Sequence, residues 1–255
     1  MPVWRAFAYW MTQYRKTWRG TIVISVANPL LFLAGIGAGL GNLVDRHTPE
    51  QLGSVSYLAF LAPGLLAASA MQTGFIEGAG RVSMAAGWEG SYRSAATTPL
   101  EPSQIMGGHL LFIAFRLLSS SAAFVAVMAA FGASDGWWAL AVLLAALLTG
   151  LAFAAPAAAW AVGVRFPRQI NSVFRFAIMP LYLFSGTFFA SGQLPGWLRP
   201  VVEALPLWQG VELCRTLSLG TASASSAAIH AGYLLALTTG GVLAARFTYR
   251  RRLHA

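Results

Sequence analysis

Arg116 is the residue whose type and surroundings most directly indicate chemistry. It lies in an apolar run of membrane-spanning length, and Ser119 and Ser120 follow it at three and four residues, on the same face of a helix. An arginine within a membrane usually faces a water-filled cavity or a polar partner, so this face predicts a lumen between two subunits, where an anionic head group could sit. An alternative stays open: the helix extends into the cytoplasm, and Arg116 reaches lipid headgroups through its long side chain.

Glu77 and Arg81 form a second candidate site. They lie four residues apart, in the order that favours an ion pair along a helix. The pair is a candidate gate at the cytoplasmic end of its helix. A capped helix terminus explains the two residues equally well.

Five aromatic residues in the last third of the chain form a third candidate set. They could line an apolar exit path for a substrate, although an aromatic belt at the membrane interface is the commoner explanation. The residues are Phe184, Phe188, Phe189, Trp197 and Trp208.

Motifs for catalysis and nucleotide binding are missing from the sequence. Lys16 is the only lysine, so a GxxxxGK[ST] loop is excluded. HExxH and GxSxG are absent, the four histidines are scattered, and the single cysteine, Cys214, excludes a multi-cysteine metal site. We therefore predict no catalytic residue, no bound metal and no cofactor on this chain.

The composition indicates a membrane protein. Of the 255 residues, 57% are hydrophobic and only 10% are charged, whereas a soluble domain carries about a quarter charged residues. The net charge of +9 comes from basic clusters between apolar runs, which argues against a nucleic-acid partner. We expect an all-α polytopic fold with six transmembrane helices, at about residues 20–40, 57–76, 105–131, 137–162, 173–189 and 227–247.

Three segments outside these spans have their own predicted roles: two flank a predicted transmembrane domain at 20–247, and one belongs to it. Residues 1–19 combine aromatic and basic residues at helical spacing, which predicts an interfacial helix. Residues 193–220 are apolar but contain three prolines and four charges, which favours re-entrant helices at the outer surface over a seventh span. Residues 248–255 form a basic cytoplasmic tail. With six spans and both termini cytoplasmic, thirteen of the seventeen basic residues lie inside.

The polar stretch at residues 88–104 separates the second and third spans. Its sequence predicts a short helix across the membrane surface, anchored by Trp88, Tyr92 and Leu100, and a turn at Pro99 and Pro102. An ordinary solvated loop is an equal alternative.

Three stretches resemble one known family. LAPGLLAASAM (61–71), SAATTPLEPSQIMGGHL (94–110) and FSGTFFASGQLPGWLRPVVEALPLWQGVELCRTLSLG (184–220) are similar to the permease subunits of ABC-2 type exporters. The similarity is to the branch with nodulation-factor (lipo-oligosaccharide) and daunorubicin-type drug export permeases. Two positions depart from the family pattern: His109 stands where an acidic residue is frequent, and Trp208-Gln209 stands where a histidine is frequent.

The resemblance implies a bacterial inner-membrane exporter of an amphipathic substrate, such as a lipid-linked glycan, glycolipid or hydrophobic drug. It implies two copies of a separate ATPase subunit, which binds ATP and Mg²⁺, and a second permease, with a homodimer expected. The ATPase would dock at the coupling segment, through Trp88, Tyr92, Arg93, Thr98, Pro99 and Leu100. The alternative function is a membrane scaffold or an intramembrane enzyme that acts without an ATPase.

Overall fold

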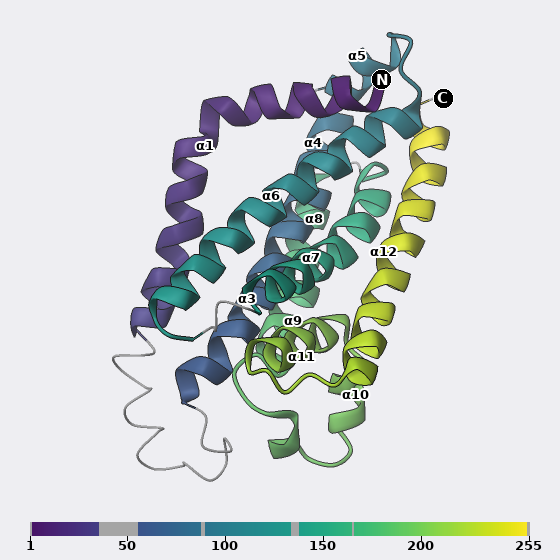
Figure 1. Ribbon diagram of the computed structural model, residues 1–255. Coiled ribbons are helices and arrows are strands. Elements are labelled where there is room, and N and C mark those ends of the chain that lie inside the picture. The colour runs from purple at the N-terminus through teal and green to yellow at the C-terminus, as the bar shows by residue number, and fades with distance from the viewer. Residues whose placement is uncertain (1, 36–55, 88–89, 134–137, 165, 254–255) are drawn as a thin grey trace.

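The structure is a bundle of long helices. The computed structural model describes residues 2–35, 56–87, 90–133, 138–164 and 166–253, and within these ranges every regular element is helical (Figure 1). Five of the helical stretches are long and apolar enough to cross a membrane: Val3–Gly35, Tyr57–Ala86, Pro102–Ala130, Ala139–Ala161 and Ala224–Leu253. They confirm the predicted all-α polytopic fold.

The predicted fifth span does not form one long apolar helix. The predicted span, 173–189, begins at the last residue of α8 (Pro167–Val173), continues through the π-helix η4 (Phe174–Ile178) and α9 (Met179–Phe184), and ends five residues beyond α9. Together these three elements form a helical stretch at 167–184. Arg168 and Arg175 lie within this stretch and lower its apolar character. The number of six spans therefore stays a prediction.

Helix α1 (Pro2–Gly35) joins the predicted interfacial helix and the first span in one element. Its ribbon bends sharply about midway, so the first half runs across one end of the bundle and the second half runs along the bundle's side (Figure 1). Part of its aromatic face turns inward. Trp10 and Tyr14 are buried and their rings contact Phe112 of helix α6 (Pro102–Ala130). The first half of α1, predicted to lie on the membrane surface, therefore also packs against α6.

The centre of the bundle is the contact between α3 (Tyr57–Phe75) and α7 (Ala139–Ala161), which also packs against α6 and α12 (Ala224–Leu253). Gly74 lies against the backbone of Gly150, and Gly78 lies against that of Ala154, so closely that a Cβ on either glycine would collide with it. Small residues four apart allow membrane helices to approach at backbone distance. The chain then continues from α3 through the π-helix η3 (Ile76–Arg81) into α4 (Val82–Ala86).

The segment predicted to be re-entrant forms two short helices, α10 (Arg199–Glu203) and α11 (Pro206–Ser218), each with a proline in its first turn. They follow the 3₁₀ turn η5 (Ser191–Gln193). Helix α11 packs against α3, α7 and α12. The two helices lie at the end of the bundle opposite to both termini and to the short helix α5 (Ser91–Ala96) (Figure 1).

Helix α11 carries a buried charged residue, Arg215, whose contacts satisfy its charge inside the protein. Its guanidinium donates hydrogen bonds to the carbonyl oxygens of Phe60, at 3.2 Å, and Gly186, at 2.8 Å. It also lies 3.8 Å from the centroid of the Phe60 ring and 3.5 Å from Glu212. The charge is satisfied inside the protein, which removes the cost that an unpaired arginine would carry at this depth.

The close approach of α3 and α7 predicts a sharp difference between two glycines. Gly74→Leu should lower the free energy of unfolding in detergent by about 3 kcal/mol or more, because the side chain must displace the Gly150 backbone. A Cβ on Gly80 would meet no atom within 4 Å, so Gly80→Leu is the matched control and should change stability little. Equal losses in the two variants would contradict this packing.

Candidate substrate route and coupling site

Arg116 lies deep in the bundle. It is fourteen residues beyond the first residue of α6, which corresponds to about 21 Å along the helix axis. Only 8% of the residue is exposed, its Nε lies 3.3 Å from Glu77 Oε1, and its guanidinium lies 5.0 Å from the centroid of the Tyr14 ring. The alternative in which Arg116 reaches lipid headgroups is therefore wrong, because its side chain turns inward to a carboxylate and an aromatic ring.

Glu77 joins two arginines. Its Oε2 lies 2.5 Å from Arg81 Nε, which confirms the predicted pair, and its Oε1 accepts from Arg116. The helix continues to Ala86 beyond this pair, so a capped helix terminus does not explain it. Glu77 and Arg81 both belong to the π-helix η3, an irregularity that is frequent at functional sites. One carboxylate against two guanidinium groups gives the cluster a net formal charge of +1, with the Arg81 side chain 35% exposed.

A polar cavity of about 200 Å³ opens beside this charge. Hydroxyl and amide side chains from three helices surround it, and the terminal nitrogens of Arg116 have no other hydrogen-bond partner among the described residues. The lining residues are Thr21, Ser25, Asn28, Pro29, Ser69, Thr73, Arg116 and Ser120. A smaller cavity of about 70 Å³ shares Asn28, Pro29 and Ser69 and extends to Gln72 and Tyr182.

The two serines predicted beside Arg116 have different positions. Both hydroxyls donate to the Arg116 carbonyl, Ser119 at 2.9 Å and Ser120 at 3.0 Å. Ser120 also lines the cavity, whereas Ser119 is not among its lining residues. The predicted polar face is therefore present, and its cavity lies between α1, α3 and α6 of this one chain.

The five candidate aromatic residues are not brought together. Phe184 is exposed, and Trp197 is 76% exposed. Phe188 contacts Tyr182, and Trp208 contacts His230 with ring centroids 5.6 Å apart. Phe189 is half-buried. These positions do not form a single lining, so an exit path through all five has no support in the chain as described.

The coupling segment contains the predicted short helix and turn. Helix α5 covers Ser91–Ala96, and Pro102 is the first residue of α6, whose capping box uses Glu101 and Gln104. Thr98 and Pro99 are exposed, and Leu100 is half-buried. Trp88 lies outside the described residues, as does the side chain of Arg93.

Tyr92 differs from its predicted position as a surface anchor. It is 2% exposed, and its hydroxyl makes hydrogen bonds with His109 Nδ1 of α6 and with the Tyr249 hydroxyl of α12, the latter at 3.1 Å. Trp10 stacks on the His109 ring at 3.9 Å. Burial raises the pKa of Tyr92 well above its ordinary value, so the phenol is neutral. Tyr92 therefore holds α5 to two long helices.

A groove of about 440 Å³ lies between α1 and the coupling segment. Its walls are mostly apolar, and it lies at the end of the bundle where both termini are found (Figure 1). The residues that line it are Arg5, Ala6, Tyr9, Trp10, Ser91, Tyr92, Ser94, Ala95, Thr98, Leu100 and Ile105. Thr98 and Leu100, both predicted coupling residues, thus share a surface that could receive a protein partner.

Three residues whose hydrogen bonds join the helices around these sites were not identified from the sequence. His109 and Tyr249 complete the Tyr92 contact, and Arg215 joins α11 to α3. A polar residue within an apolar helix was the available signal for His109 and Arg215. At the second departure from the family pattern, the Gln209 side chain contacts His230 of α12.

These features define a polytopic helical membrane protein with a charged, polar cavity within its helices and the short helix α5 at one end. The chain matches the family described as ABC-2 type transporter over residues 3–218, and it therefore belongs to that family. Membership makes it the membrane component of an ABC transporter, and it implies association with an ABC ATPase subunit.

Three similar proteins are each named Nodulation protein J. The one from Rhizobium meliloti (strain 1021) is 31% identical over 227 residues, 86% of this chain and 82% of that protein. The one from Rhizobium leguminosarum bv. trifolii is 32% identical over 222 residues, 84% and 80% of the two chains. The one from Rhizobium leguminosarum bv. viciae is 30% identical over 256 residues, 96% and 94% of the two chains.

The burial of the Glu77–Arg116 pair leads to a testable difference in stability. Glu77→Gln should lower the free energy of unfolding by about 3 kcal/mol, because Arg116 is left buried without a counter-charge. Adding Arg116→Gln should restore at least half of that loss. Glu203→Gln removes the carboxylate of the exposed Arg199–Glu203 pair and should cost less than about 1 kcal/mol. The free energies of unfolding are measured in detergent. A loss for Glu77→Gln as small as that for Glu203→Gln would contradict the buried ion pair.

Proposed function

We propose that the chain is the permease subunit of an ATP-driven exporter that moves an amphipathic substrate with an anionic head group outward across a bacterial cytoplasmic membrane. The observation that carries this proposal is the net positive Glu77–Arg81–Arg116 cluster beside the polar cavity. An anionic head group would gain charge-assisted hydrogen bonds from the free nitrogens of Arg116. A lipid-linked glycan, a glycolipid or a hydrophobic drug that carries such a group is the expected substrate class.

The energy source would be a separate ATPase subunit, present in two copies with ATP and Mg²⁺, against a dimer of permeases. The sequence has no nucleotide-binding loop of its own, and family membership implies an ATPase partner. The groove between α1 and the coupling segment supports a docking position, because it is largely apolar and lies next to the exposed Thr98. A helix of the ATPase is the element that such a groove would accommodate.

Movement of α5 would reach the cavity through Tyr92. Tyr92 is bonded to His109, and Arg116 follows His109 on α6 by seven residues, or two helical turns. Because α6 carries both residues, a rigid-body displacement of α5 would shift the wall of the cavity that holds Arg116. The bond to Tyr249 would carry the same displacement into α12.

The proposed orientation puts both termini and α5 in the cytoplasm. Thirteen of the seventeen basic residues then lie inside, as cytoplasmic loops require. Helices α10 and α11 would lie at the outer surface, since they occupy the other end of the bundle (Figure 1).

Two neighbouring threonines test the docking position. Thr98 lines the groove and Thr97 does not, although both are exposed. In complexes co-expressed with the ATPase subunit, Thr98→Arg should reduce the ATPase that co-purifies by about tenfold, which corresponds to about 1.4 kcal/mol, because the new side chain occupies the groove. Thr97→Arg should retain the ATPase and its substrate-stimulated hydrolysis.

Two outcomes would contradict this account. Equal loss of ATPase in both variants would mean that the groove is not the docking surface. Absence of any co-purifying ATPase from the wild-type complex would favour a scaffold or an enzyme that acts alone.

A further inference from the structure

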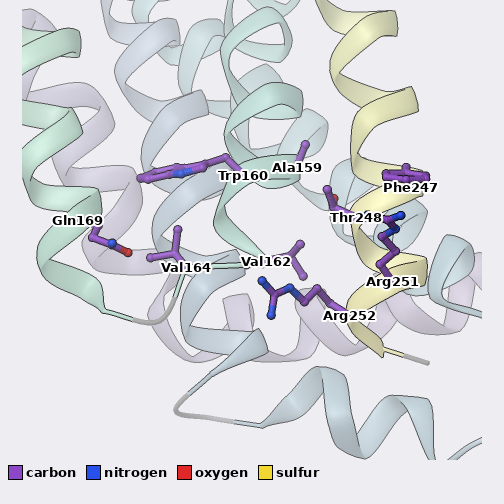
Figure 2. Close-up of a pocket in the computed structure, with 10 residues that line it drawn as sticks. Ala159, Trp160, Val162, Val164, Gln169, Phe247, Thr248, Arg251 and Arg252 are labelled. Carbon is purple, nitrogen blue, oxygen red and sulfur yellow. The ribbon is translucent and has the colours of Figure 1, made fainter. Parts of the chain in front are cut away.

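A second large cavity lies at the end of the bundle that carries the C-terminus (Figure 1). It has a volume of about 500 Å³ and is formed by the end of α7, the segment that leads to α8, and the last turns of α12. Figure 2 shows Trp160, Val164 and Gln169 on one side, Phe247, Thr248 and Arg251 on the other, and Arg252 reaching from α12 toward Val162. A volume of this size is within the usual range for binding a small molecule or a headgroup.

Two exposed arginines at this cavity have no acidic partner among the described residues. Arg251 and Arg252 are exposed, and neither forms an ion pair within the described residues. Every acidic side chain of the described residues has another partner: Glu77 binds Arg81 and Arg116, Glu101 caps α6, Glu203 binds Arg199 and Glu212 binds Arg215. In the part of the chain that the structure describes, two guanidinium groups therefore line this cavity without an acidic side chain paired to them.

The two arginines are held at the cavity by local contacts. The Arg251 guanidinium lies 4.5 Å from the centroid of the Phe247 ring. Arg252 lies against Gly163, where its Nη2 is 3.5 Å from the position that a Cβ would take. Arg252 also lines an adjoining cavity of about 370 Å³, together with Gly163 and Val164. A ligand at Arg252 can therefore extend into either space.

The rest of the lining is apolar. Trp160 and Phe247 are both exposed, and Ala159, Val162 and Val164 lie between them. Exposed aromatic residues at the ends of membrane helices are typical of the headgroup level. A soluble anion would use the arginines and leave this apolar wall uncovered, whereas a phospholipid has an anionic phosphate and acyl chains that match both parts.

We propose that this cavity binds an anionic phospholipid of the adjacent leaflet, with its phosphate between Arg251 and Arg252 and its acyl chains along Trp160 and Phe247. Basic pockets between membrane helices are suited to acidic headgroups. Gln169 and Thr248 provide neutral polar groups for the remaining headgroup oxygens. This inference does not depend on the transported substrate or on the ATPase.

Native mass spectrometry of the full-length protein, purified with mixed phosphatidylglycerol and phosphatidylethanolamine, tests the proposal. The wild-type protein should retain phosphatidylglycerol preferentially. The double substitution Arg251→Gln with Arg252→Gln should reduce that retention by about tenfold or more, because both phosphate contacts are lost. The double substitution Arg246→Gln with Arg250→Gln is the control, since it removes the same charge from exposed positions of α12 outside the cavity, and should retain the lipid.

Two further measurements keep the result unambiguous. Trp160→Ala should also lower phosphatidylglycerol retention, because the acyl chains lose a contact, and inorganic phosphate at millimolar concentration should not displace the lipid. Equal losses of phosphatidylglycerol in the two double variants would mean that retention depends only on the net charge of α12, and would overturn the proposal. Displacement of the lipid by phosphate would assign the cavity to a free anion instead. Unchanged ATPase co-purification in all variants would confirm that they fold and would leave the proposed function intact.

Discussion

The contact between α3 and α7 is the constraint on which the rest of the structure depends. Gly74 and Gly78 let the two backbones meet at Gly150 and Ala154, with no room for a side chain between them. Glu77 lies between those two glycines in the sequence, so the same contact fixes the backbone that carries this carboxylate. The π-helical turn that follows α3 then directs Glu77 toward α6 and Arg116. A charge that would be costly in a membrane is thereby held against its partner at a fixed depth.

Buried polar contacts between distant helices account for how the two ends of the molecule could act together. Tyr92 joins the coupling helix to α6 and α12, Glu77 joins α3 to α6, and Arg215 joins α11 to α3. In an apolar surrounding, each such group must keep its partner or lose several kcal/mol, as a polar group without a hydrogen bond does. The helices that carry them are therefore expected to move as connected bodies. The polar cavity between α1, α3 and α6 lies among these connections, where relative movement of the helices would change its shape.

Much of the architecture could be predicted from the sequence, because apolar runs, prolines and pairs four residues apart are local signals. These signals identified five long helices, the short helix and turn of the coupling segment, and the Glu77–Arg81 pair. The Glu77–Arg116 contact could not be predicted in the same way, because 39 residues separate the two side chains. The burial of Tyr92 was missed for the same reason, since its partners lie on two other helices. The fifth span was expected at 173–189, but the helical elements there begin at Pro167 and end at Phe184, and they contain two arginines and a π-helical turn that set them apart from the five long helices.

The central claim is that the cavity beside Arg116 is part of the transport route, and the reactivity of a cysteine within it tests that claim most directly. Ser69 lines both polar cavities, and the single native cysteine, Cys214, is buried and can be replaced by alanine. In the complex of permease and ATPase in lipid nanodiscs, the labelling rate of Ser69→Cys by a membrane-impermeant thiol reagent should change several-fold when ATP is added. Thr221→Cys, at an exposed position outside the cavities, should label at the same rate with and without ATP. A Ser69→Cys rate that does not respond to ATP would contradict the account.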